Sequence, residues 1–406
     1  MTEQAKVPAI RFAGFTDPWE QRKASEVFQI VDDRGHPTLP VLSATQNQGM
    51  IYRDDSGRYI GHDESNEIGY KRVLPGDFVV HLRSFQGGFA HSQYEGITSP
   101  AYTVFRAKEP TSHSDRFWKH WFISEHFIAG LSTVTYGIRD GRSISVDEFM
   151  NTFLAFPAVE EQAAISRLLD YLDDLITLHQ RKYDKLVILK KSMLEKMFPK
   201  DGESVPEIRF AGFTDPWEQR KLGDVASSFD YGLNAAATEY DGQNKYLRIT
   251  DIDDETHEFS KSDLTTPLAD LAMSADYLLK EGDLLFARTG ASVGKTYLYR
   301  QFDGMVYFAG FLIRARIGEG ADPEFAYQAT LTDAYKKYVA ITSQRSGQPG
   351  VNAQEYADYQ LMLPSKTEQQ QIGMTLRSLD DLITLHQRKL ELLQNIKKSL
   401  LDKMFV

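Results

Sequence analysis

Cysteine is absent from the chain. Its absence excludes disulfides, thiol catalysis and cysteine-ligated zinc. The sequence also lacks an uninterrupted apolar stretch of membrane length, and its start, MTEQAKVPAIRF, has no basic cluster followed by an apolar run. Those features mark membrane spans and secretory signals. We therefore expect a cytoplasmic protein.

Positive charge is also in short supply. The 46 lysines and arginines are outnumbered by 57 aspartates and glutamates, which gives a net charge of −11. This balance argues against nucleic acid as a partner, but binding depends on where the charge lies and not on its sum. A nucleic-acid-binding protein of this composition needs local basic faces or a partner that contributes cations.

What the chain does contain is a long internal repeat. Eleven letters, LDDLITLHQRK, occupy residues 172–182 and return at 379–389, and fourteen letters, IRFAGFTDPWEQRK, occupy residues 10–23 and return at 208–221. The two shifts are 207 and 198 residues, so the second copy is nine residues longer between its ends. The chain is two copies of one plan.

The eleven-letter repeat lies in a stretch that predicts a long helix in each copy. Apolar residues recur at three-and-four spacing from Ile165 to Met197 and from Ile372 to Met404, the pattern of a helix that buries one seam. About forty residues would make a rod of roughly 60 Å. A long surface helix packed on its own domain is one interpretation, but two near-identical stripes favour an antiparallel pair that forms an intramolecular coiled coil. The expected seam residues are Leu168, Leu172, Leu175, Leu186, Leu189, Met193, Leu379, Leu382, Leu393, Ile396 and Leu400.

Two variable segments, about 24–156 and 222–363, lie between the repeated ends. Both alternate short β-rich runs with turns, and each has one helical piece, near residues 117–128 and 323–339. We therefore predict an α+β protein with a pseudo-twofold internal repeat and two mixed α/β domains separated by the long helices. The expected boundaries are 1–156, 157–200 (helix), 201–363 and 364–406 (helix). Because the ends repeat and the middles differ, we infer that the ends do one job twice while the middles read different things.

Three motifs bear on whether the chain binds a metal or a nucleotide or acts as a catalyst, and none of them fits such a site well. His179 and His386 fall at equivalent positions of the two helices, where we expect paired core histidines, since a metal site would need more ligands. The run from Gly290 to Thr296 resembles a phosphate loop but has three residues between its glycines where four are required. Asp-Pro-Trp at 17–19, repeated at 215–217, predicts a turn with a buried tryptophan. We expect no catalytic residue, no metal and no cofactor in this chain.

Loops rich in glycine, arginine, glutamine and serine mark both variable segments. Their side chains are those that make bidentate contacts with base edges and phosphates, although surface turns share the same composition. The residues that we expect to contact DNA are Arg83, Gln86, Arg139 and Arg142 in the first segment, and Lys245, Arg248, Arg288, Thr289, Ser292, Lys295, Gln344, Arg345 and Gln348 in the second.

Taken together, these motifs resemble the specificity subunit of type I restriction–modification systems. The features shared with that family are the doubled FAGFTDPWE stretch, the Gly282-Asp283 strand start followed by Arg288 and Gly290, the Pro-x3-Glu-Gln-x2-Ile helix starts and the Lys-Met-Phe helix ends. The likeness covers essentially the whole chain. The first Gly-Asp loop departs from the pattern, because Arg83 is displaced relative to Arg288.

The resemblance implies two target recognition domains, each reading one half of a split, asymmetric double-stranded DNA site, with the helices setting the gap. It also implies two modification subunits that carry S-adenosylmethionine and methylate adenine, and restriction subunits that use ATP and magnesium. The chain itself would be non-catalytic. The main rival is a coiled-coil scaffold that joins two binding domains without touching DNA. An independent adenine methyltransferase is a second rival. Against it, Asp-Pro-Trp at 17–19 and 215–217 lacks the second proline of the Asp-Pro-Pro-aromatic motif of amino-methyltransferases, and no glycine-rich cofactor loop precedes it.

Overall fold

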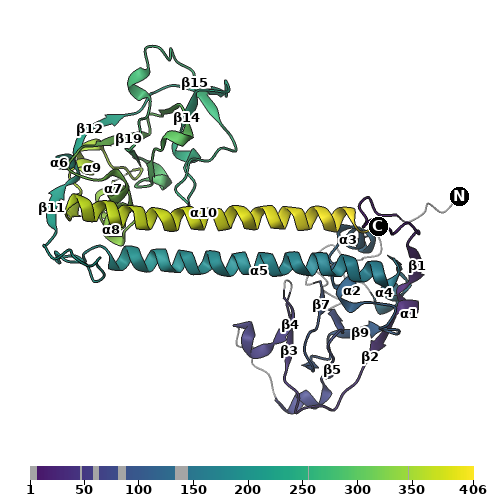
Figure 1. Ribbon diagram of the computed structural model, residues 1–406. Helices are drawn as coiled ribbons and strands as arrows, with labels where there is room; N and C mark the ends of the chain where they lie inside the picture. The colour runs from purple at the N-terminus through teal and green to yellow at the C-terminus, as the bar shows by residue number, and fades with distance from the viewer. Residues whose placement is uncertain are drawn as a thin grey trace. The chain divides into compact units, whose positions relative to one another are not determined.

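The computed structural model describes residues 7–45, 48–57, 64–80, 88–132, 145–254, 256–345 and 347–406. The chain forms two compact units (Figure 1). Unit 1 contains Met1–Leu178 and Leu390–Val406, and unit 2 contains His179–Lys389. The boundaries between the two units, at residues 178/179 and 389/390, therefore lie inside the two long helices.

Unit 1 is built around a four-stranded antiparallel sheet in the order β2-β9-β6-β7, covered by short helices. The strands of this sheet are β2 (Phe28–Val31), β9 (Thr103–Ala107), β6 (Phe78–Val80) and β7 (Phe89–His91). Three two-stranded pairs flank it, β1 (Glu20–Lys23) with β10 (Phe153–Phe156), β3 (Leu42–Thr45) with β4 (Gly49–Tyr52), and β5 (Lys71–Val73) with β8 (Gly96–Thr98). The short helices are α1 (Ala24–Val27), η1 (Arg53–Ser56), η2 (Glu64–Gly69), α2 (Asp115–Trp121), α3 (Glu125–Ser132) and α4 (Val146–Asn151).

Unit 2 repeats this sheet with the order β12-β19-β16-β17. Its strands are β12 (Ala226–Tyr231), β19 (Leu312–Ile317), β16 (Asp283–Ala287) and β17 (Thr296–Leu298). The smaller pairs are β11 (Glu218–Lys221) with β20 (Gln360–Leu363), β13 (Ala237–Glu239) with β15 (Thr265–Pro267), and the parallel pair β14 (Lys245–Leu247) with β18 (Val306–Phe308). The short helices are α6 (Leu222–Val225), η4 (Ile249–Asp251), η5 (Ala275–Tyr277), η6 (Gly290–Ser292), η7 (Gln301–Asp303), α7 (Pro323–Ala329), α8 (Asp333–Thr342) and α9 (Ala353–Ala357).

The helical piece predicted in each variable segment is broken into two helices. In unit 2, Asp322 caps α7 through a hydrogen bond from the Phe325 amide, and Thr332 caps α8. A residue that caps a new helix ends the preceding one, because its own backbone is extended. Ser145 and Asn352, which are equivalent at a shift of 207, each begin a short helix with a capping box.

The long helices are α5 (Val159–Lys196) and α10 (Lys366–Lys403), each of 38 residues. In unit 2 they run antiparallel, since His179 contacts His386 while Lys190, further along α5, pairs with Asp380, earlier on α10. The histidines are paired as predicted, with 2.7 Å between their Nδ1 atoms. Of the described helices, none combines the length and apolar character that crossing a bilayer requires.

Three of the predicted seam residues are not in the seam. Leu189, Leu382 and Ile396 have exposed fractions of 47%, 43% and 39%. Leu379 is buried as predicted, and Leu376 and Leu390, which were not predicted, are buried as well. Apolar residues occur on more than one side of these helices, so spacing alone did not identify the buried side.

The start of each long helix is fixed by the repeated Glu-Gln pair. Arg11 donates two hydrogen bonds to Glu161, at 2.8 and 2.6 Å. In unit 2, Arg209 donates to Glu368 at 2.7 and 2.8 Å. Both carboxylates are buried. These pairs connect the two repeated stretches of each unit, which explains why the arginine and the glutamate recur together.

The end of each long helix lies in a core that also contains the repeated tryptophan. Trp19 and Phe405 pack in unit 1 with ring centroids 6.2 Å apart, and Trp217 and Phe198 pack in unit 2 at 6.0 Å. Both tryptophans are buried, as the Asp-Pro-Trp turn predicted. Unit 1 is thus completed by the last residues of the chain, and unit 2 by the end of α5.

The Gly-Asp pairs have a structural role. Gly282 has a φ of +84°, which favours glycine, and Asp283 accepts a hydrogen bond from the Lys280 amide at 2.9 Å. The buried Asp283 carboxylate also pairs with Arg316 on β19 at 3.0 Å. Asp77 repeats this arrangement with Arg106 at 2.7 Å. The motif therefore closes a turn and pairs adjacent strands in each unit.

Glu368→Gln should lower the free energy of unfolding by about 3 kcal/mol, because it leaves the Arg209 guanidinium, 11% exposed, without its counter-charge. The matched control is Glu218→Gln, which removes an exposed partner of Arg220 and should cost less than about 0.5 kcal/mol. Urea unfolding of both variants measures the difference. Equal small losses would contradict the assigned role of the buried pair.

Candidate nucleic-acid interface

One edge of the unit 2 sheet gathers aromatic and cationic side chains. Strands β12 and β16 end at this edge and β19 begins there, because β19 lies antiparallel between them. Tyr231 is the last residue of β12, Arg288 follows β16, and Phe311 precedes β19. The Arg288 guanidinium carbon lies 5.1 Å from the Tyr231 ring centroid and 5.9 Å from that of Phe311. These are cation–π distances.

The two polar loops predicted in unit 2 meet beside this edge. The Val351 amide donates to the Arg288 carbonyl at 2.9 Å, and the Gly290 amide donates to the Pro349 carbonyl at 3.0 Å. Thr289 and Gly350 form an antiparallel bridge. The structure thus brings loop 288–294 and loop 344–350 together, although they are about fifty residues apart in the sequence.

Gly290 allows the second loop to approach closely. Its φ is +74°, and a Cβ atom at this position would lie 2.9 Å from Nε2 of Gln348. Gln348, Gln344 and Arg345 are exposed, while Thr289 and Ser292 are half-buried. A larger residue at position 290 would displace the exposed amide of Gln348.

Four of the predicted cationic contacts are held by intramolecular partners. Arg248 forms a bidentate pair with Asp251, and Arg345 pairs with Glu355. The remaining two are lysines. Lys245 donates to the Asp303 carbonyl. Lys295 pairs with Asp254 and donates to the Ile252 carbonyl at 3.0 Å. Their contribution to DNA binding stays a prediction, and any contact would compete with these pairs.

The candidates of the first segment, Arg83, Gln86, Arg139 and Arg142, lie outside the described residues. Sequence reasoning missed Tyr231 and Phe311, which are 44% and 57% exposed. The available signal was an aromatic residue beside a glycine at a strand end, as in Tyr231-Gly232 and Gly310-Phe311.

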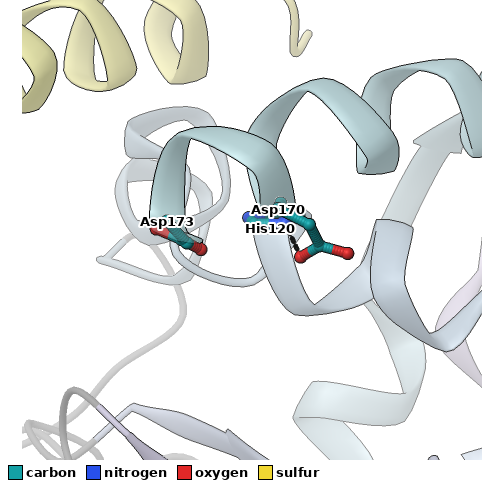
Figure 2. A group of neighbouring side chains, drawn as sticks. All are labelled: His120, Asp170 and Asp173. Carbon is teal, nitrogen blue, oxygen red and sulfur yellow. Dashed lines mark hydrogen bonds and ion pairs between the residues drawn. The ribbon is translucent and has the colours of Figure 1, made fainter. Parts of the chain in front are cut away.

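A second cluster, in unit 1, has the composition of a metal site. His120, Asp170 and Asp173 place one ligand atom each within 4.8 Å of one another, and Figure 2 shows the His120 ring against Asp170. Both carboxylates already have cationic partners, since Lys119 lies 3.1 Å from Asp170 and Lys397 pairs with Asp173. The two ammonium groups balance the two carboxylates, so the arrangement is that of an ion-pair network that joins α2, α5 and α10 within unit 1.

The same network sets the titration of its members. Burial lowers the pKa of His120, and its Nε2 lies 2.8 Å from Asp170. Burial alone would raise the pKa of Asp170, but the hydrogen bond with His120 and the charge of Lys119 outweigh it and lower this pKa to about 2. The carboxylate is therefore stabilised as the anion.

Asp170→Asn should lower the free energy of unfolding by at most about 2 kcal/mol above pH 4. Because the folded pKa of Asp170 is below its ordinary value, the contribution is complete above about pH 4 and is lost as the pH falls toward 2. The exposed neighbour Asp174→Asn is the control. Unfolding curves between pH 2 and pH 7 measure both, and a deficit that is the same at every pH would contradict the ion-pair assignment.

The sequence of this chain is similar to that of proteins of known family. Residues 214–395 match the family described as "Type I restriction modification DNA specificity domain". A curated relative, the Type I restriction enzyme MjaVIII specificity subunit of Methanocaldococcus jannaschii, is 23% identical over 272 residues, which cover 63% of this chain and 61% of the relative. The match thus spans less than two thirds of that relative.

The solved S subunit of the type I restriction–modification system from M. genitalium has a TM-score of 0.63 to this chain at 14% identity, covering 98% of this chain and 99% of that one. The HsdS subunit from Thermoanaerobacter tengcongensis has a TM-score of 0.43 at 16% identity, with 98% of each chain covered. The first likeness shows a shared fold. The resemblance drawn from the repeated motifs and the predicted fold class are confirmed.

Proposed function

The chain is related to the specificity subunits of type I restriction–modification systems, and from this relationship we propose that it reads a bipartite, asymmetric DNA site. The observation that carries the proposal is the position of the loop cluster, residues 288–294 and 344–350, inside the segment matched by the DNA specificity domain. Exposed glutamine and arginine side chains at such loops, Gln344, Arg345 and Gln348, can contact base edges and phosphates.

Each unit would read one half of the site. The two units share the sheet order and the polar contacts at the helix ends, whereas their loop sequences differ. A shared framework with different loops supports two readers of different sequence. Helices of 38 residues are about 57 Å long, which exceeds one turn of DNA, about 34–36 Å, and supports a role in setting the gap between the half-sites.

We further propose that the chain acts in the cytoplasm as a non-catalytic subunit. Two modification subunits would methylate adenine with S-adenosylmethionine, and restriction subunits would cleave with ATP and magnesium. Exposed apolar side chains on the helices, including Ile188 of α5 and Leu392 of α10, support contact with protein partners. The chain has a net charge of −11, which opposes binding to a DNA duplex. Cationic surfaces of the partner subunits would offset this repulsion.

The rival scaffold function is not favoured, because the matched family is one of DNA specificity domains. The exposed Gln344, Arg345 and Gln348 side chains beside the sheet edge support DNA contact, which a scaffold would not need. Both functions require protein partners, so DNA sequence dependence is the property that separates them.

The proposal predicts that adenine methylation in cells will follow a split motif only when this chain is present with its modification subunit. Genome-wide mapping of methyladenine, with and without the chain, measures this. The matched control is the chain without the modification subunit, which should leave no methylation. Stable assembly with the modification subunit but unchanged methylation would favour the scaffold.

A further inference from the structure

We propose that Arg288 reads a guanine in the half-site assigned to unit 2, and that Tyr231 and Phe311 hold its guanidinium in position for that contact. The inference rests on the proposed function and deepens it. It concerns one base pair and three side chains at the sheet edge.

The fold fixes the three residues relative to one another. The Arg288 amide donates to the Phe311 carbonyl at 3.1 Å, and the Arg288 carbonyl accepts from Val351 at 2.9 Å. The Tyr231 hydroxyl accepts a hydrogen bond from the Ala353 amide at 3.2 Å, which anchors its ring at the start of α9. The backbone of Arg288 is thus held from two sides, and one of its aromatic neighbours is held as well.

Aromatic neighbours orient a guanidinium without occupying its donors. A cation–π contact uses the face of the planar group, whereas hydrogen bonds leave from its edge. Nε of Arg288 is buried and has no described hydrogen-bond partner. Within the described residues, no carboxylate or carbonyl accepts from the guanidinium. Its terminal Nη1 and Nη2 donors therefore remain for a ligand.

The contrast with the other cations strengthens the assignment. Arg248 and Arg345 are bound to carboxylates of their own unit, and Lys245 and Lys295 donate to carbonyls. Arg288 alone among these five predicted cationic contacts of unit 2 has only aromatic neighbours for its charge. An arginine that serves the fold would be expected to find an acid, as Arg314 and Arg316 do with Asp230 and Asp283.

The chemistry of this arginine selects guanine. Guanine presents two adjacent acceptors, O6 and N7, in the major groove, and these match the fork of an arginine. The exposed amide of Gln348 lies beside the same loop, so a second base edge could be contacted next to the first. A phosphate contact would also use the charge, but it would carry no sequence preference.

The test measures competition binding by the full chain with its modification subunits, on duplexes in which each position of the wild-type motif is varied in turn. Arg288→Gln should reduce the preference for guanine at one position of one half-site by roughly ten- to a hundredfold and leave the other half-site unchanged. Arg288→Lys keeps the charge but lacks the planar fork, so it should retain most of the affinity and lose most of the preference.

The aromatic residues have their own readout. Phe311→Leu and Tyr231→Leu should weaken the preference at the same position, by roughly three- to tenfold, since the guanidinium is less well oriented. Tyr231→Phe keeps the ring and should retain the preference. An unchanged preference in both leucine variants would overturn the positioning role.

The control is Arg220→Gln, which removes an exposed arginine of unit 2 that lies on β11 beside Glu218. It should leave the motif unchanged. A wild-type motif without guanine in either half, a uniform loss across all sequences in Arg288→Gln, or full discrimination in Arg288→Lys would each overturn the inference while the proposed function stands. A wild-type complex that shows no sequence preference would overturn the proposed function itself.

Discussion

The burial of each long-helix end in a core that also contains a repeated tryptophan is the constraint on which this structure depends. Phe405 packs against Trp19, and Phe198 packs against Trp217. The unit 1 core needs residues 390–406, which are remote in sequence, whereas the unit 2 core includes the second half of α5, which directly precedes the rest of that unit. In each contact the tryptophan comes from the start of one copy and the phenylalanine from the end of the other copy, so both repeated stretches are needed twice.

Polar contacts make the same junction specific. The Glu-Gln pair that begins each helix binds an arginine of the preceding repeat and a backbone amide of the variable segment, as in Gln162 with Ser114 and Gln369 with Asp322. These buried groups must find partners, so they permit few alternative packings. The variable segment is fixed to its helix by atoms that do not depend on its loops. The loops are consequently free to differ, which is the physical basis for the proposal of two readers on one framework.

The sequence predicted what local pattern and repetition determine. The long helices, the buried tryptophans and the paired histidines follow from spacing or from the duplication itself, whereas the contact of the two polar loops was not predicted. Leu189, Leu382 and Ile396 were assigned to the seam wrongly because apolar residues occur on several sides of each helix. Burial of one side is decided by the partner helix, which a single stripe does not specify.

The candidate site was harder to predict, because the availability of a charge depends on tertiary partners. Arg345 and Arg288 look alike as loop arginines, but Glu355 lies beside the first and two aromatic rings lie beside the second. Tyr231 and Phe311 come from strands eighty residues apart, which meet only because β19 pairs with β12. No local pattern in the sequence connects them.

The assignment of one reader to each unit is tested by exchanging residues 222–363 for the equivalent segment of a relative with a different motif. We expect the methylated motif of the complex to change in one half-site only, because Arg209, Glu368 and Gln369, which fix the segment to its helix, lie outside the exchanged residues. A change in both half-sites, or in neither, would contradict the assignment of one reader to each unit.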